Sequence, residues 1–208
     1  MARVQVTPDS FTLVEFDAGV IAGLAEELAG AVGFPDDVDV AIEVDEELPL
    51  PLTGSTADIV DGRAVLWFAG ANFEDSKHRA EFCEPLARTE LTMALLRASD
   101  RLTPGFASAP ADEDLTDAQR QVWEAWAEGR AGRLGEHVRR VRRVYHFRLY
   151  NGFTDVADAA FERLWGADAL TWSDLEAVRA EAAAADTRPQ PKKRAGIRKE
   201  TLKPADAT

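Results

Sequence analysis

The chain has 208 residues, of which 46% are hydrophobic and 29% charged, and its formal net charge is −13. This length and composition allow one large domain or two small ones with a buried core, which excludes global disorder. The only cysteine, Cys83, excludes an intramolecular disulfide framework and fits a reducing compartment. The N-terminus has no apolar signal core, and no apolar stretch approaches the roughly 18–20 residues that span a bilayer. We therefore expect a soluble, cytoplasmic protein that makes no contact with membranes.

The first third of the chain carries the pattern of a small sheet with a helix. Weak alternation over residues 3–16 predicts one or two short strands. A helix with apolar residues at helical spacing follows from Asp17, a plausible N-cap, to Gly33. Alternation of apolar and polar residues predicts a half-exposed strand over 38–45. An Asp-Gly turn between two apolar runs predicts a hairpin whose strands cover 57–60 and 63–69.

The rest of the folded chain is predicted to be helical. Asp75 or Ser76 can cap a long helix that reaches about Ser99, and Pro85 can delay or kink its start. Residues 101–115 are rich in Pro, Ala and Asp and are expected to form a linker. Four further helices follow, the last opened by a capping box at Ser173 to Glu176; they cover about 117–128, 134–150, 155–165 and 173–185.

The last residues, 187–208, differ from the rest in charge. They hold four of the five lysines and carry a net charge of +5, so the remaining chain carries −18. Their prolines and few apolar residues predict a tail that is disordered on its own. It is either a solubilising terminus or a binding segment that releases counterions from an anionic partner. For the second interpretation the contact residues are Lys192, Lys193, Arg194, Arg198, Lys199 and Lys203. Elsewhere arginine supplies almost all positive charge, which together with abundant alanine indicates a GC-rich bacterial genome.

The predicted helix 134–150 carries a basic face. Arg139, Arg142, Arg143 and His146 recur at helical spacing, so like charges gather on one side and require anions nearby. Those anions are either carboxylates of the same protein or phosphates, which the planar guanidinium binds with two hydrogen bonds. The phosphates would belong to a nucleic-acid backbone or to a small molecule. Apolar residues form a stripe on another side of this helix, at Leu134, Val138, Val141, Tyr145 and Leu149.

Aromatic residues are concentrated in the helical half. We expect them to form its core, with a groove for a protein partner as the alternative. They are Trp123, Trp126, Tyr145, Phe147, Tyr150, Phe153, Phe161, Trp165 and Trp172.

No catalytic motif is evident. The three histidines and Cys83 lack the spacing of zinc ligands, and we expect Cys83 to be packed rather than nucleophilic. Neither a serine nucleophile elbow nor a phosphate-binding glycine-rich loop is present. Acidic residues bracket the strand at 38–45, where Glu43 and Asp45 could serve a divalent metal or acid–base chemistry. The simpler interpretation is a solvated sheet face or a docking face for basic segments. We expect no metal and no cofactor.

Residues 17–99 show a weak resemblance to minimal zincin-like metallopeptidase domains. In those domains the last strand leads into a helix that carries an HExxH motif. Here the strand at 64–69 precedes a helix, and the stretch from Thr89 to Met93 occupies the place of the motif. Only Glu90 matches, because Thr89 and Met93 replace both metal-binding histidines. The resemblance therefore implies a fold without zinc peptidase activity.

These observations together predict an α+β protein. A small antiparallel sheet with two helices occupies 1–100, the linker covers 101–115, helices occupy 116–186, and the disordered basic tail covers 187–208. The two halves either share one core or form separate domains. The leading functional hypothesis is a non-enzymatic protein that binds a nucleic acid, a ribonucleoprotein or an acidic protein through its tail and the arginine face. The alternatives are a hydrolase that uses Glu43, Asp45 or Glu90, and a protein adaptor that uses the aromatics.

Overall fold

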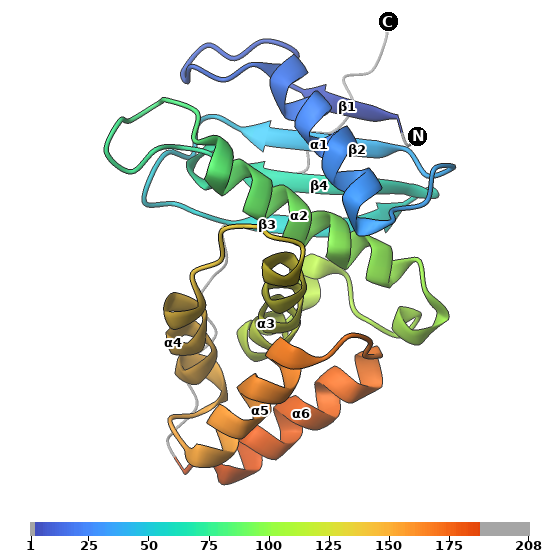
Figure 1. Cartoon of the computed structure of the whole chain (residues 1–208), viewed down its shortest axis with the longest axis vertical. Helices are drawn as coiled ribbons and strands as arrows, with labels where there is room; N and C mark the ends of the chain where they lie inside the picture. Colours follow the sequence, from blue (N-terminus) through green and yellow to red (C-terminus); the bar gives the residue numbers. More distant parts are fainter. Residues whose placement is uncertain (1–2, 188–208) are drawn as a thin grey trace, which may run out of the picture.

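The computed structural model describes residues 3–187 and shows a sheet with helices packed on one face, continued by a helical half (Figure 1). The expected α+β class is confirmed. The elements are β1 (Val4–Thr7), α1 (Ala18–Val32), β2 (Val40–Asp45), β3 (Ser55–Val60), β4 (Arg63–Ala69), α2 (Glu84–Arg101), α3 (Asp117–Arg133), α4 (Arg140–Asn151), α5 (Asp155–Gly166) and α6 (Trp172–Ala185). Among these helices, none is both long and apolar enough to cross a membrane. The basic tail from 188 onward lies outside the described residues.

The four-stranded sheet has the order β1-β2-β4-β3 and is mixed. Strands β1, β2 and β4 run parallel, and β3 pairs antiparallel with β4. The expectation of an antiparallel sheet is therefore wrong for two of its three pairings. Helix α1 carries the chain back across the sheet, so β2 starts at the same end as β1, as in any helical crossover. The predicted hairpin of β3 and β4 is present, and its turn residues Asp61 and Gly62 both have positive φ.

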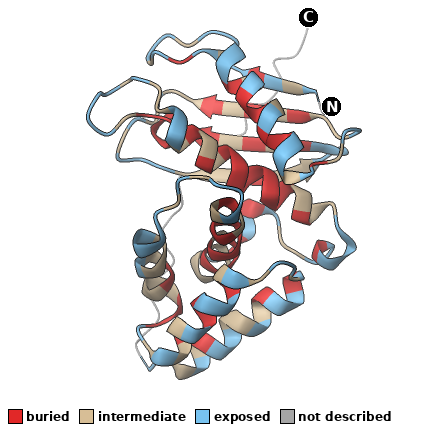
Figure 2. Cartoon of the chain, in the orientation of Figure 1, coloured by how far each residue is buried: buried red, intermediate tan, exposed pale blue. Residues whose placement is uncertain are grey.

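The first core lies between the sheet and helices α1 and α2. Alternate residues of β2 and β4 are fully or almost fully buried beneath these helices, among them Ile42, Leu66 and Phe68 (Figure 2). The intervening residues of β2, including Glu43 and Asp45, lie on the other face and are half-buried. The predicted half-exposed strand is thus confirmed, with its acidic residues on the face that α1 and α2 leave open.

Two helices begin later than the sequence indicated, and one begins slightly earlier. Helix α2 begins at Glu84 after N-cap Cys83, because Pro85 suits the first turn, where its missing N–H is not needed. Helix α4 begins only at Arg140, after an irregular segment that starts at Gly135. The capping box of α6 joins Thr171 to Asp174, two residues earlier than predicted, since the threonine hydroxyl accepts the N–H of Asp174.

The helical half has a core of its own, which contains Trp123, Trp126 and Phe161. A small apolar cluster connects the halves where α2 meets α3, through Met93, Leu96, Ala127 and Ala131. Two predicted core aromatics are instead on the surface: Tyr145 is 54% exposed and Phe153 49%. Val141 of the predicted apolar stripe is 86% exposed. Helix α4 starts late and buries Phe147, so the predicted stripe is divided: Val138 packs on the cluster between the halves, and Val141 faces solvent.

The segment predicted as a linker holds the two halves together through a buried carboxylate. It contains two short 3-10 helices, and both Phe106 and Asp112 are buried. The carboxylate of Asp112 accepts hydrogen bonds from three arginines and from the Ala57 N–H of β3. The arginines are Arg97 and Arg101 of α2 and Arg120 of α3. Asp112 therefore fixes the sheet edge, α2 and α3 relative to one another.

Candidate functional site

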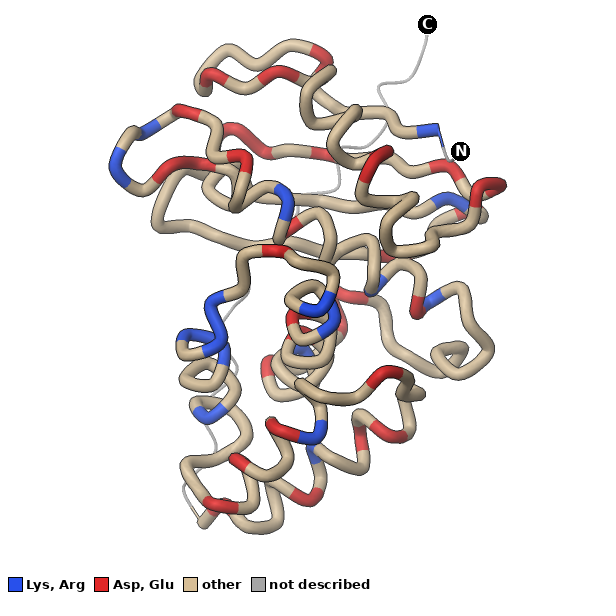
Figure 3. Tube along the Cα trace, viewed as in Figure 1, with Lys and Arg blue, Asp and Glu red and all other residues tan. Residues whose placement is uncertain are grey.

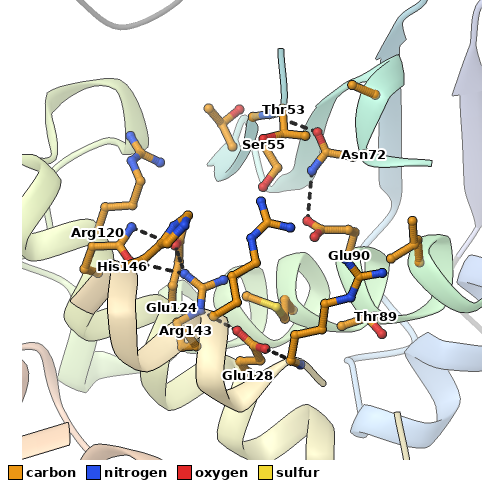
Figure 4. A pocket seen from close by; sticks show the side chains of 18 of the residues that line it. Thr53, Ser55, Asn72, Thr89, Glu90, Arg120, Glu124, Glu128, Arg143 and His146 are labelled. Atoms are coloured by element: carbon orange, nitrogen blue, oxygen red, sulfur yellow. Dashed lines mark hydrogen bonds and ion pairs between the residues drawn. The ribbon is translucent and has the colours of Figure 1, made fainter. Parts of the chain in front are cut away.

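A polar pocket of about 590 Å3 lies where the two halves meet. Its walls are the segment leading into β3, the short helix Gly70–Asn72, α2, α3 and α4 (Figure 4). A pocket of this size accommodates a small molecule or the end of a larger one. The wall residues come from six separate stretches of the chain, which the Asp112 contacts and the α2–α3 packing hold together.

The structure brings the whole predicted basic face into this pocket. Arg139, Arg142, Arg143 and His146 all line it, together with His137 and Arg120. Figure 3 shows how Lys and Arg residues gather along α4. The six tail residues predicted to bind the same partner lie beyond the described part of the chain.

Arg143 is paired within the protein. Its guanidinium forms ion pairs with Glu124 and Glu128 of α3 and also donates to the Gln121 side chain. Burial lowers the pKa of Arg143, but the two carboxylates outweigh burial and raise it above its usual value. Burial likewise raises the pKa of Glu124, but Arg143 outweighs it and leaves that pKa lowered. Arg143 is therefore a permanent cation that attaches α4 to α3, as the pairing alternative had predicted.

Arg139 and Arg142 differ from Arg143. Both are exposed residues that line the pocket, and within residues 3–187 neither side chain forms a hydrogen bond or an ion pair. The backbone N–H of Arg139 donates to Glu128 at 3.0 Å, which places an acceptor at the uncapped start of α4. The two guanidiniums keep their full hydrogen-bonding capacity for a ligand.

His146 lies within electrostatic reach of both the unpaired Arg142 and the paired Arg143. Burial lowers the pKa of this imidazole, and the charges of Arg142 and Arg143 lower it further, although Glu124 and Glu128 oppose them. His146 is consequently neutral at pH 7. A bound anion would raise this pKa, because negative charge favours the protonated ring.

The opposite wall presents hydrogen-bond acceptors. Asn72 accepts the Gly54 N–H at 2.9 Å and donates its amide to Oε2 of Glu90 at 2.9 Å. Burial raises the pKa of Glu90, although the Asn72 hydrogen bond and the charge of Arg143 partly oppose it. Oε1 of Glu90 has no hydrogen-bond partner among the described residues. In Figure 4, Glu90 and Asn72 face His146 and Arg143 across the pocket.

The other predicted carboxylates lie elsewhere. Glu43 and Asp45 do not line the pocket, so they do not converge with Glu90 as the hydrolase hypothesis required. Glu46 of the same acidic cluster accepts the N–H groups of Thr12 and Leu13 and has a structural role. Within residues 3–187, no group of three or more His, Cys, Asp or Glu residues is placed to hold a metal ion.

No protein-family model, curated protein or solved structure matches this chain. The resemblance to minimal zincin domains therefore stays a prediction. Its three residues, Thr89, Glu90 and Met93, do share the pocket. The single hydroxyl proton of Thr89 is shared between the Pro85 and His137 carbonyls, so Thr89 has no proton to donate elsewhere.

Sequence reasoning missed much of the pocket. Asn72, Arg120, Glu124 and Glu128 carried no local motif, and Thr53 and Ser55 lie in a stretch interpreted as a connector. One signal was present: Glu124 and Glu128 are four residues apart on α3, which places both carboxylates on one side of that helix. Such a pair is a natural partner for an arginine face on a neighbouring helix.

Proposed function

We propose that this chain is a non-enzymatic binding protein for an anionic partner, and that Arg139 and Arg142 contact the anionic group in the pocket. The observation that supports the proposal is their lack of partners. Most arginines of residues 3–187 form ion pairs with carboxylates, as Arg97, Arg130 and Arg143 do. A protein with a net charge of −13 has carboxylates to spare, so two unpaired arginines at one pocket are consistent with an anion held from outside.

The pocket lining is mixed in charge, with four arginines and six Asp and Glu residues, so the place of each charge matters more than their sum. The acidic body repels polyanions at long range, so an anion must find a local excess of positive charge. Arg143 does not contribute to that excess because Glu124 and Glu128 neutralise it. On the α4 side Arg139 and Arg142 supply it, because neither guanidinium has an ion-pair partner within residues 3–187. The tail residues from Lys192 to Lys203 remain a proposed second contact for a longer polyanion such as a nucleic acid. We also propose a cytoplasmic location, which the single cysteine favours.

Calorimetric titration with inorganic pyrophosphate tests this function. Arg142→Gln should weaken binding about ten-fold, or about 1.4 kcal/mol, because a charge-assisted hydrogen bond is lost. Arg140→Gln is the matched control: Arg140 lies on the same helix, does not line this pocket and pairs with exposed Glu162. The control should bind within about two-fold of the parent, since exposed pairs contribute little. Equal losses in both variants, or no binding by the parent, would overturn the proposal.

A second titration separates the pocket from the tail. A short DNA duplex is added to the full chain and to a chain that ends at Asp186. If the duplex binds only the full chain, and Arg142→Gln leaves that binding unchanged, the tail carries polyanion binding and the pocket does not.

A further inference from the structure

We propose that the ligand of this pocket is a sugar-like molecule: a small polyhydroxylated compound with a phosphate or carboxylate at one end. This inference rests on the proposed function and adds the chemistry of the wall opposite α4. The pocket has two chemically distinct sides, and a ligand that satisfies both must carry different groups at its two ends.

The α4 side takes the anion. Arg139 and Arg142 present unpaired guanidiniums, and neutral His146 beside them can donate a hydrogen bond or accept a proton as the anion binds. Polar groups deeper on this side already have partners, since Arg143 is held by Glu124 and Glu128. The anionic group therefore stays at the outer part of this wall.

The opposite side takes hydrogen-bond donors that carry no negative charge. Oε1 of Glu90 is free while Asn72 holds Oε2, so the carboxyl group is fixed in orientation with one oxygen available. The hydroxyls of Thr53 and Ser55, which line the same side, form no hydrogen bond within residues 3–187 (Figure 4). A second anionic group would be repelled here by Glu90. Hydroxyl groups fit, because each can donate to the carboxylate and exchange hydrogen bonds with the serine and threonine.

An aromatic ring completes this side. Trp67 of β4 lines the pocket, is half-buried, and stacks on no other aromatic ring of the described chain. Gly54 leaves space beside it: a Cβ at this position would lie 3.6 Å from the indole. An indole face, a fixed carboxylate and small hydroxyls are the groups that suit a sugar ring, whose C–H face is apolar and whose edge carries hydroxyls. The volume of about 590 Å3 exceeds that of a bare phosphate several-fold and leaves room for such a ring.

Calorimetry with a matched set of probes tests the inference. The probes are inorganic phosphate, ribose, ribose 5-phosphate, glucose 6-phosphate and gluconate. At least one of the three sugar anions should bind at least ten-fold more tightly than both inorganic phosphate and ribose. Tighter binding of a sugar phosphate identifies the anion as phosphate, and tighter binding of gluconate identifies it as carboxylate.

Two variants assign the ends of the ligand. Glu90→Gln keeps the size of the side chain and its acceptor toward Asn72, and it should reduce the preference for the sugar anion over inorganic phosphate to below three-fold. Arg142→Gln should weaken the binding of phosphate and sugar anion alike. Thermal unfolding of both variants controls for folding.

The outcomes separate this inference from the proposed function. If phosphate binds but no sugar anion binds more tightly, or if Glu90→Gln leaves the preference intact, the pocket is an anion site without a sugar subsite and the inference is wrong. If neither phosphate nor any sugar anion binds, the proposed function itself fails and the inference falls with it.

Discussion

Arginines serve two different purposes in this molecule, at the α2–α3 junction and on α4. At the junction, Arg97 is 2% exposed and pairs with Asp112, and Arg130 pairs with Asp100 at 2.6 Å. On α4, Arg139 and Arg142 are exposed and unpaired within residues 3–187. The sequence contains the same residue type in both places. What separates them is whether a carboxylate is buried beside the guanidinium, which follows from the tertiary packing. The junction gains rigidity from its arginines, and α4 keeps two of its own available for binding.

The largest effect is expected at the junction, from Asp112→Ala. This change leaves Arg97 buried without its carboxylate and also removes the acceptor of the Ala57 N–H. Loss of one partner of a buried ion pair costs about 3–5 kcal/mol. Urea unfolding measures it. Asp114→Ala is the matched control, because Asp114 lies in the same 3-10 helix but is exposed, and it should change stability by less than about 0.5 kcal/mol. Similar losses in both variants would show that the Asp112 network does not join the halves.

The next effect concerns the side of α3 that faces away from the pocket. A Cβ at Gly129 would lie 2.4 Å from the backbone oxygen of Trp165 in α5, so Gly129→Ala forces the two helices apart. We expect a loss of about 1–3 kcal/mol in unfolding free energy. Gly30→Ala in α1 is the control, because nothing lies within 4 Å of its Cβ, and it should gain about 0.5–1 kcal/mol. A gain in both variants would contradict the close α3–α5 packing.

A smaller effect is expected at the pocket wall, from Glu90→Gln. Burial raises the pKa of Glu90, so between its unfolded and folded pKa values the native state binds more protons than the unfolded state. This carboxyl group therefore stabilises the fold at low pH, and that contribution is lost as the pH rises through the folded pKa. Glu90→Gln has no such group to ionise. Its free energy of unfolding should therefore rise relative to that of the parent protein by about 1 kcal/mol between pH 4 and pH 7.

Urea unfolding at both pH values provides that measurement, with exposed Glu47→Gln as the control. A constant difference between Glu90→Gln and the parent across this range would show that the Glu90 carboxyl is not desolvated.

The smallest expected effect is on the titration of His146. Because the charge of Arg142 lowers the pKa of His146, Arg142→Gln should raise the midpoint of the His146 titration. The charges of Arg143, Glu124 and Glu128 remain and set the rest of the shift. Proton NMR of the imidazole follows the titration, and Arg140→Gln serves as the same-helix control. A larger shift in the control than in Arg142→Gln would place Arg142 away from the pocket.

The sequence predicted local features well and long-range ones poorly. The hairpin at Asp61 and Gly62 is specified by two adjacent turn residues, and α5 by a strong apolar pattern after its Thr154 N-cap. The order of the strands cannot be predicted from neighbouring residues. The position of β4 between β2 and β3 depends on how α1 and α2 cover one face of the sheet. The linker looked structureless in composition, yet Asp112 within it accepts hydrogen bonds from three arginines and a backbone N–H. Its partners lie 8 to 55 residues away, and no local pattern reveals them.

The pocket shows the same division between local features, which the sequence predicted, and long-range contacts, which it did not. The basic face of α4 was predicted from spacing, and its assembly into one wall follows from that spacing. Whether each arginine was paired could not be predicted, because Glu124 and Glu128 reach Arg143 only through the α3–α4 packing. Asn72 and Glu90 form a hydrogen bond because the short helix at 70–72 packs against α2. No pattern in the sequence indicates this contact.

The most direct test of the central claim is a nitrogen-15 NMR titration of the full chain with inorganic phosphate. If the pocket binds the anion, the largest shifts fall on its backbone amides, from Arg139 to His146 on one wall and around Asn72 and Glu90 on the other. Shifts confined to the residues from Lys192 to Lys203, with the pocket amides unmoved, would contradict the claim and assign anion binding to the tail.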